Sequence, residues 1–374
     1  QKIKNKKSLV IFIFVDGLVD RSVLGIKNLQ DYMPHTAKFF KGGFDFRNHH
    51  VNAEWTLPSF ASIFSGQYSQ THKLFDPHAI HEIGKSFDIL SQYFKRNNYV
   101  TFSAGGNPRI SPSHGYVKGF DRTVYRSFMP AQEVISNFLE HSLVFKKRDQ
   151  FCFLQFNDIH HNLAKVPDYS VMSQLRSHVV AYEADPLMGR TRNKWIPKSN
   201  NKKRVYLERI KRLDNYLKII YEHIEQNYDS SEVCVCLTSD HGQSFLTDDE
   251  HWLSSARTKA IWLLKTSNQG NDFVNEYTEG VDIFNTILSE CGIDFDINVD
   301  GMLPSCFGGS KSRNYTFSQS IYPGQTYKAV INADHGRYIY ETSKPIVRVE
   351  DILSDEFAVQ ILQNNDNSFT KQKV

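Results

Sequence analysis

The chain has 374 residues, of which 40% are hydrophobic and 23% charged, so it can bury a sizeable core and its composition is not that of a disordered protein. The formal net charge is only +3 and the lysines and arginines are scattered, which argues against a nucleic-acid-binding protein. The five cysteines lack metal-site spacing, and we expect no disulfide framework.

The first predicted element is a strand at residues 8–15, a continuous apolar and β-branched run that ends at Asp16 and Gly17. Such a run is typical of a strand that is buried on both faces of a parallel sheet. Because Asp16 interrupts the run far short of the roughly 20 residues that span a bilayer, we expect no transmembrane segment. The sequence stays compatible with an upstream anchor, and it leaves the oligomeric state open.

Strands and helices then alternate along most of the chain. Apolar residues at helical spacing predict helices at 58–64, 89–97, 131–144, 205–226 and 281–291. Short apolar runs predict strands at 99–104, 150–156, 232–238 and 260–265. This order predicts an α/β sandwich with a largely parallel central sheet flanked by helices.

The pattern changes after Gly292. Residues 327–331 and 337–340 flank an Asp-His-Gly turn, which predicts a hairpin in a small antiparallel C-terminal subdomain. We therefore expect a large α/β domain at 8–305, a hairpin subdomain at 306–363 packed on it, and a frayed tail at 364–374. Residues 165–203 are polar and irregular, which fits either a substrate-facing insertion or a mobile surface loop.

Three predicted strands are followed by acidic residues or histidines, namely Asp16, Asp158 with His160, and Asp240 with His241. Because the carboxyl ends of parallel strands meet at one edge of a sheet, we expect these side chains to converge. Carboxylates and imidazoles together bind divalent cations, so the pattern predicts a metal site. A single aspartate after a strand is more often a helix cap, and only the agreement of three strand ends favours metal binding.

Residues 54–68, which read EWTLPSFASIFSGQY, carry a more specific pattern. They resemble the sulfatase signature, Cys-x-Pro-Ser-Arg followed by a short helix and Thr-Gly-x-Tyr, with Thr56 at the cysteine position. Further similar pieces follow in the family's order: an Asp-x-His loop at 158–160, Ser-Asp-His-Gly at 239–242 and Asp-Gly-x-x-Leu-Pro at 300–304. The chain thus resembles the sulfatase branch of the alkaline phosphatase superfamily over nearly its whole length, which implies that superfamily's α/β sandwich.

Several positions depart from the sulfatase pattern. Thr56 cannot yield the formylglycine that sulfatases make from cysteine, and Phe60 replaces the signature arginine. The sequence reads Gly-Gly-Asn-Pro at 105–108, without the family's lysine, and Gly17 stands where sulfatases commonly have a second aspartate. These changes remove the aldehyde precursor and the cations of the sulfate site.

The residues that remain are Asp16, Thr56, Asp240 and His241, and they resemble the metal site of phosphoryl-transferring relatives. These include phosphoethanolamine transferases, lipoteichoic acid synthases, nucleotide pyrophosphatase/phosphodiesterases and phosphonate monoester hydrolases, in which a metal-bound hydroxyl attacks phosphorus. The resemblance implies a metal-dependent phosphoryl-type transferase or hydrolase with Thr56 as nucleophile and a covalent phospho-threonine intermediate. It implies one divalent ion, with zinc or manganese favoured over calcium or magnesium.

Five other residues have less certain roles in this scheme. His160 either contacts the substrate or protonates the leaving group, and His251 and Asn107 are candidates for binding the substrate. A second ion held by Asp158, His160 or His335 stays open, although the Asp-x-x-x-His spacing of dinuclear relatives is absent.

Two alternatives stay open: a sulfatase with an atypical site, and a sulfatase-fold pseudoenzyme that binds a glycan or another partner. The expected substrate is a small-molecule, lipid or glycan ester, and the compartment is either cytoplasmic or periplasmic and envelope-associated. Hydrolase and transferase are not separated, because they differ only in what accepts the transferred group.

Overall fold

The computed structural model describes residues 6–76, 87–160, 198–248, 253–268, 270, 272–295, 299–346, 352, 358–365 and 368–373. Most of the irregular segment 165–203 therefore lies outside the described residues, apart from its last part, which begins a long helix. Every helix in the described ranges is too short or too polar to cross a bilayer.

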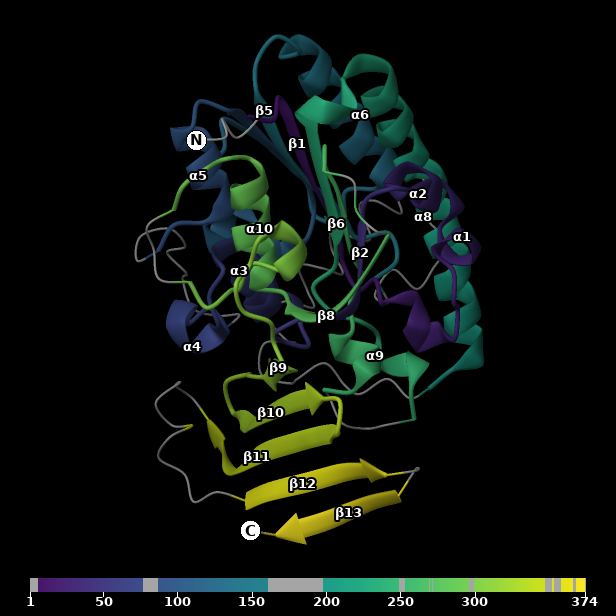
Figure 1. The fold of residues 1–374 in the computed structure, drawn as a ribbon, viewed down its shortest axis with the longest axis vertical. Coiled ribbons are helices and arrows are strands. Elements are labelled where there is room, and N and C mark those ends of the chain that lie inside the picture. The colour runs from purple at the N-terminus through teal and green to yellow at the C-terminus, as the bar shows by residue number, and fades with distance from the viewer. Residues whose placement is uncertain are drawn as a thin grey trace.

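A sheet of eight strands forms the centre of the described structure, in the order β4-β3-β5-β1-β6-β7-β2-β8 (Figure 1). The strands are β1 (Leu9–Val15), β2 (Phe44–His50), β3 (Val100–Gly105), β4 (Arg122–Tyr125), β5 (Gln150–Phe156), β6 (Val233–Thr238), β7 (Trp262–Lys265) and β8 (Asp272–Glu279). β1 runs parallel to both β5 and β6, whereas β7 runs antiparallel to β6 and β2. The prediction of a largely parallel sheet is confirmed.

Helices cover both faces of this sheet (Figure 1). One face carries α1 (Leu29–Tyr32), α2 (Pro34–Phe40), α6 (Ala131–Val144) and α8 (Asn200–Asn227). The other carries α3 (Thr56–Ser65), α4 (Ser69–His72), α5 (Leu90–Arg96) and α10 (Asp282–Glu290). Along β1, Ile11 and Ile13 pack with the first set while Phe12 and Phe14 pack with the second. This two-sided burial is the reason that β1 is apolar throughout.

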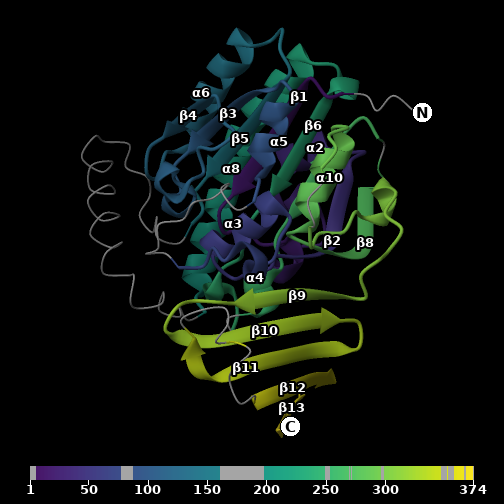
Figure 2. The ribbon, with the colours of Figure 1, turned by 90° about the vertical axis from the view of Figure 1, so that its left-hand side faces the viewer.

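A second, antiparallel sheet lies at one end of the molecule, in the order β13-β12-β11-β10-β9 (Figures 1 and 2). Its strands are β9 (Tyr315–Ser320), β10 (Gln325–Ala333), β11 (Gly336–Ile346), β12 (Ala358–Asn365) and β13 (Ser368–Lys373). β10 and β11 form the predicted hairpin, which is therefore confirmed. Residues 364–374, expected as a frayed tail, include the end of β12 and all of β13; the domain limits stay a prediction.

The sequence patterns did not predict β2, because this strand contains charged and polar residues that are buried by pairing. Asp45 of β2 pairs with Arg21 at 2.5 Å, and the Arg21 side chain is fully buried. Burial raises the pKa of Asp45, while the charges of Arg21 and Arg47 oppose that shift. A strand of this kind gives no apolar run, since its burial depends on a partner outside the strand.

His49 of β2 makes stability depend on pH. Its side chain is fully buried, and Nδ1 lies 3.2 Å from Thr278 Oγ1. Burial, with a smaller contribution from His50, lowers the pKa of His49 to about 3. A histidine folded in its neutral form contributes stability above its unfolded-state pKa of about 6.5, and that contribution is lost as the pH falls toward the folded-state pKa.

We expect His49→Gln to weaken this dependence, so that the difference in unfolding free energy between wild type and variant changes by about 2 kcal/mol from pH 6.5 to pH 5. Urea unfolding at the two pH values measures it. His335→Gln, at an exposed turn, is the control. A difference that stays constant with pH would contradict the assignment.

Candidate active site

The carboxyl ends of β1, β5 and β6 lie side by side at one edge of the central sheet. The register pairs Val15 of β1 with Phe156 of β5, and Phe14 of β1 with Thr238 of β6. The residues that follow these strands are therefore delivered to one place, as parallel pairing requires. They include Asp16 from β1 and the short segments after β5 and β6.

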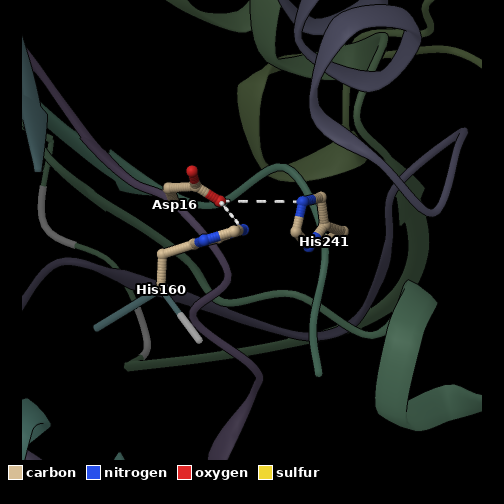
Figure 3. Close-up of side chains that lie close together, drawn as sticks. All are labelled: Asp16, His160 and His241. Carbon is tan, nitrogen blue, oxygen red and sulfur yellow. Dashed lines mark ion pairs between the residues drawn. The ribbon is translucent and has the colours of Figure 1, made fainter. Parts of the chain in front are cut away.

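Asp16, His160 and His241 point toward one another at this edge (Figure 3). Asp16 Oδ1 lies 3.7 Å from His160 Nε2 and 3.6 Å from His241 Nε2. One candidate ligand atom from each residue lies within 4.8 Å of the others. Asp240 adds a second carboxylate, with Oδ2 3.4 Å from His241 Nε2. We refer to Asp16, His160, Asp240 and His241 as the carboxylate–histidine cluster.

Two oxygens of the cluster are buried without a hydrogen-bond donor in the described part of the chain, Asp16 Oδ1 and Asp240 Oδ2. Burial, reinforced by the charge of Asp240, raises the pKa of Asp16 well above its usual range, and burial raises that of Asp240 to about 6. Buried carboxylate oxygens without partners are costly, and a cation would satisfy them. The donor set therefore fits a bound metal ion.

The two histidines of the cluster are held in the form that binds metals. Burial lowers the pKa of His160 and His241 to about 3, assisted in His160 by the neighbouring His241 and in both residues by the charge of Arg257. His241 Nδ1 lies 2.9 Å from the Gly242 carbonyl, so Nδ1 donates and Nε2 faces the cluster with its lone pair. Neutral imidazoles beside carboxylates suit zinc or manganese.

Thr56, the first residue of α3, also borders this cluster. Its Oγ1 lies 3.3 Å from His241 Nε2, and the side chain is only 5% exposed. Ser59, one turn later, donates to the backbone carbonyl of Asp240 at 2.6 Å and so ties the start of α3 to the end of β6. The helix N-terminus, with its partial positive charge, thus lies against the cluster.

Asn107 and Asn157 fix the orientation of Asp16. Asn107 Nδ2 donates to Asp16 Oδ2 at 2.8 Å, and Asn157 Nδ2 donates to the same oxygen at 2.9 Å. Asn107 Oδ1 accepts from the backbone N–H of Arg109 at 2.8 Å. This geometry favours an orienting role for Asn107 over the expected contact with substrate. Asn157 was not among the expected site residues, although it is a polar residue directly after a buried strand, which was the available signal.

Gly17 occupies a position that a larger side chain would disturb. Its φ is +75°, and a Cβ there would lie 2.2 Å from Gln243 Nε2. Its backbone N–H donates to Asp240 Oδ1 at 3.1 Å, and its carbonyl accepts from Tyr206 Oη at 2.7 Å. At this positive φ, an aspartate or any other residue with a Cβ would be strained.

Three other predicted residues lie apart from the cluster or outside the described residues. Asp158 Oδ1 accepts from the backbone N–H of Ala131, the first residue of α6, at 3.1 Å, although the N-cap residue of that helix is Pro130. His335 lies in the exposed turn between β10 and β11 and is not part of the cluster. His251 lies outside the described residues.

The position of the sulfatase arginine is part of the hydrophobic core. Phe60 is fully buried, and its ring centroid lies 4.9 Å from that of Phe14 and 5.2 Å from that of Phe153. A buried cation from another segment, Arg257, lies near the carboxylate–histidine cluster. It donates to the carbonyl of Gly242, the residue after His241, at 2.9 Å. Arg257 was not among the expected site residues, because no sequence pattern distinguishes it from other arginines.

The sulfatase family model matches residues 8–293. The chain belongs to the sulfatase family. Sulfatases are ester hydrolases of the alkaline phosphatase superfamily, so the resemblance expected from the motifs is confirmed at this level. No curated protein sequence gives a significant match.

Solved structures show the same fold at low identity. The chain is similar to the phosphonate monoester hydrolase SpPMH from Silicibacter pomeroyi, with 15% identity, a TM-score of 0.71, and 97% of this chain and 90% of that chain covered. A putative sulfatase from Bacteroides thetaiotaomicron is 15% identical with a TM-score of 0.68, and the match covers 96% of this chain and 86% of that chain. BT4656, solved with its substrate D-glucosamine-2-N,6-O-disulfate, is 12% identical with a TM-score of 0.64, and the match covers 96% of this chain and 91% of that chain. The alkaline-phosphatase-like fold is confirmed.

Proposed function

We propose that this sulfatase-family protein is a metal-dependent phosphoryl-type transferase or hydrolase that acts on phosphodiesters or phosphonate esters. The observation that carries the proposal is the hydroxyl of Thr56, 3.3 Å from His241 Nε2 at the edge of the carboxylate–histidine cluster. A threonine at this position cannot supply formylglycine by the route open to cysteine, whereas its hydroxyl is a competent nucleophile once activated.

The proposed metal ligands are Asp16, Thr56, Asp240 and His241, with His160 as a further ligand. Asp16 and Asp240 both offer buried oxygens that lack hydrogen-bond donors among the described residues. A bound divalent ion would lower the pKa of the threonine hydroxyl and offset negative charge on the ester's non-bridging oxygens. His160 Nε2 lies 3.7 Å from Asp16 Oδ1. This position favours a role as a metal ligand over protonation of the leaving group, the role considered from the sequence.

The proposed reaction has two steps. Thr56 Oγ1 attacks phosphorus, the bond from phosphorus to the leaving oxygen breaks, and the hydroxyl proton ends on the departing alcohol. Water or an acceptor alcohol then attacks the phospho-threonine, the bond to Oγ1 breaks, and a proton returns to Thr56. The N-terminus of α3 favours the negative charge of the transferred group in both steps.

Sulfate-ester hydrolysis is the second candidate. Membership of the sulfatase family and the fold shared with a protein whose substrate is a disulfated glucosamine favour it. The loss of the signature cysteine and of the arginine, replaced by buried Phe60, counts against it. A small-molecule, lipid or glycan ester is compatible with both candidates.

An ester panel separates the candidates. We expect the purified protein, supplied with zinc or manganese, to cleave bis-nitrophenyl phosphate or a nitrophenyl phosphonate monoester, and to lose this activity on chelation. Nitrophenyl phosphate and nitrophenyl sulfate complete the panel. Cleavage of the sulfate alone would overturn the proposal. Metal binding without cleavage of any ester would point to a strict transferase, and the absence of metal binding to a pseudoenzyme.

A further inference from the structure

We infer that the C-terminal sheet takes part in catalysis: its first strand, β9, fixes the segment that leads into Thr56, and Ser320 is the positioning residue. We call residues 51–55 the lead-in segment. The inference rests on the proposed role of Thr56 as the nucleophile. Figures 1 and 2 show β9 as the strand of the second sheet nearest to the main body.

The backbone of β9 runs along the lead-in segment. Ala53 and Gln319 form an isolated parallel β-bridge, and the N–H of Gln319 donates to the Asn52 carbonyl at 2.9 Å. Ser318 Oγ donates to the Val51 carbonyl at 2.6 Å. These contacts join parts of the chain that lie far apart in the sequence, and all of them end within a few residues of Thr56.

The two residues directly before Thr56 are both held by side-chain contacts with this region. Ser320 Oγ donates to Glu54 Oε1 at 2.7 Å, and the two residues are only 1% and 2% exposed. Trp55 Nε1 donates to the carbonyl of Ile321, the residue after β9, at 3.0 Å. A buried hydrogen bond to a carboxylate is strong and directional, so it restricts where Glu54 can lie.

Glu54 also connects the lead-in segment to the carboxylate–histidine cluster. Arg257 donates through one nitrogen to the Glu54 carbonyl and through another to the Gly242 carbonyl, the second contact at 2.9 Å. Gly242 directly follows His241, whose Nε2 lies 3.3 Å from Thr56 Oγ1. The spacing between nucleophile and cluster is thus fixed through Glu54 from both directions.

The start of α3 depends on these contacts because it lacks a cap of its own. Its N-cap residue is Trp55, in an extended conformation, and no side chain caps the helix there. A helix that begins without Ser, Thr, Asp or Asn at the N-cap is less strongly fixed at its first turn. Thr56 is in that first turn, so its placement relies on tertiary contacts, namely those that β9 provides and the hydrogen bond from Ser59 to the Asp240 carbonyl.

Ser320→Ala tests the inference, with Thr326→Val as the matched control. Thr326 Oγ1 donates to Glu341 Oε1 at 2.8 Å within the same sheet, between β10 and β11, away from the lead-in segment. Five quantities are compared with wild type for each variant: hydrogen exchange of peptides covering residues 51–60, kcat and KM on the ester that wild type cleaves, Tm and bound metal.

We expect Ser320→Ala to raise hydrogen exchange in the 51–60 peptides and to lower kcat about tenfold, with KM and bound metal little changed, because small displacements of a reacting group are costly. Thr326→Val should match wild type in both respects. Exchange and kcat of Ser320→Ala equal to those of the control would overturn the inference. A rise in exchange throughout the chain with a matching fall in Tm would also overturn it, since the role would then be only structural.

The two proposals can fail separately. Full turnover in Thr56→Ala would remove the proposed nucleophile and the catalytic part of this inference, while exchange at 51–60 would still report whether β9 holds the segment. Loss of turnover in Thr56→Ala with no effect of Ser320→Ala would leave the proposed function standing and remove the role of β9.

Discussion

Thr56→Ala is expected to lower kcat by at least about 1,000-fold on any ester that the wild type cleaves, because no other group replaces a removed nucleophile. The side chain is buried at the start of α3, and removing it leaves the hydrogen bond from Ser59 to the Asp240 carbonyl in place. The fold should therefore persist, and most of the bound metal with it. Steady-state kinetics, circular dichroism and metal analysis on one preparation measure all three.

Thr56→Ser is the matched control for this prediction. It keeps the hydroxyl within reach of His241 and removes only one methyl group, so it should retain a substantial part of the wild-type kcat. Trapping of phosphate on wild type and Thr56→Ser, but not on Thr56→Ala, would identify the covalent intermediate by mass spectrometry. Turnover in Thr56→Ala within about tenfold of wild type would exclude Thr56 as the nucleophile.

Asp240→Asn is expected to remove the metal and the activity together. Asp240 Oδ2 is buried, lies 3.4 Å from His241 Nε2 and lacks a hydrogen-bond donor among the described residues. Asparagine keeps the size of the side chain and an oxygen for the Gly17 N–H, but it loses the negative charge that a divalent cation requires. We expect the metal affinity to fall by at least about 100-fold. Metal analysis after dialysis, and thermal shift with and without added zinc, measure this loss.

Asp214→Asn controls for a general loss of stability. Asp214 is equally buried and accepts hydrogen bonds from the backbone N–H of His35 at 2.8 Å and of Thr36 at 2.9 Å, outside the carboxylate–histidine cluster. Its substitution should lower Tm without lowering the metal content of the folded protein. If Asp240→Asn bound as much metal as wild type, Asp240 would not be a ligand.

The sequence by itself determined the elements whose signals are local. The strand at 150–156 and the helix at 131–144 were predicted with the limits that the structure has, because a buried apolar run and an amphipathic spacing belong to the segment itself. The convergence of Asp16, Asp240 and His241 could also be predicted, since parallel strands deliver their following residues to one edge. The order of the sulfatase-like motifs indicated the family.

Only the tertiary structure decided which side chains meet. It directed His160 toward Asp16, turned Asp158 toward α6 and placed Asn107 and Asn157 on the same Asp16 oxygen. Each outcome depends on rotamers and on partners from distant segments, which periodicity and spacing do not contain.

The same limit applies to burial and to the lead-in segment. β2 escaped prediction because Asp45 is buried by its pairing with Arg21, and the contact between Ser320 and Glu54 joins residues 266 positions apart. A local sequence pattern indicates which residues of a segment face the core and which face solvent. The position of a nucleophile relative to its cluster is set instead by contacts that form only when the whole chain has folded.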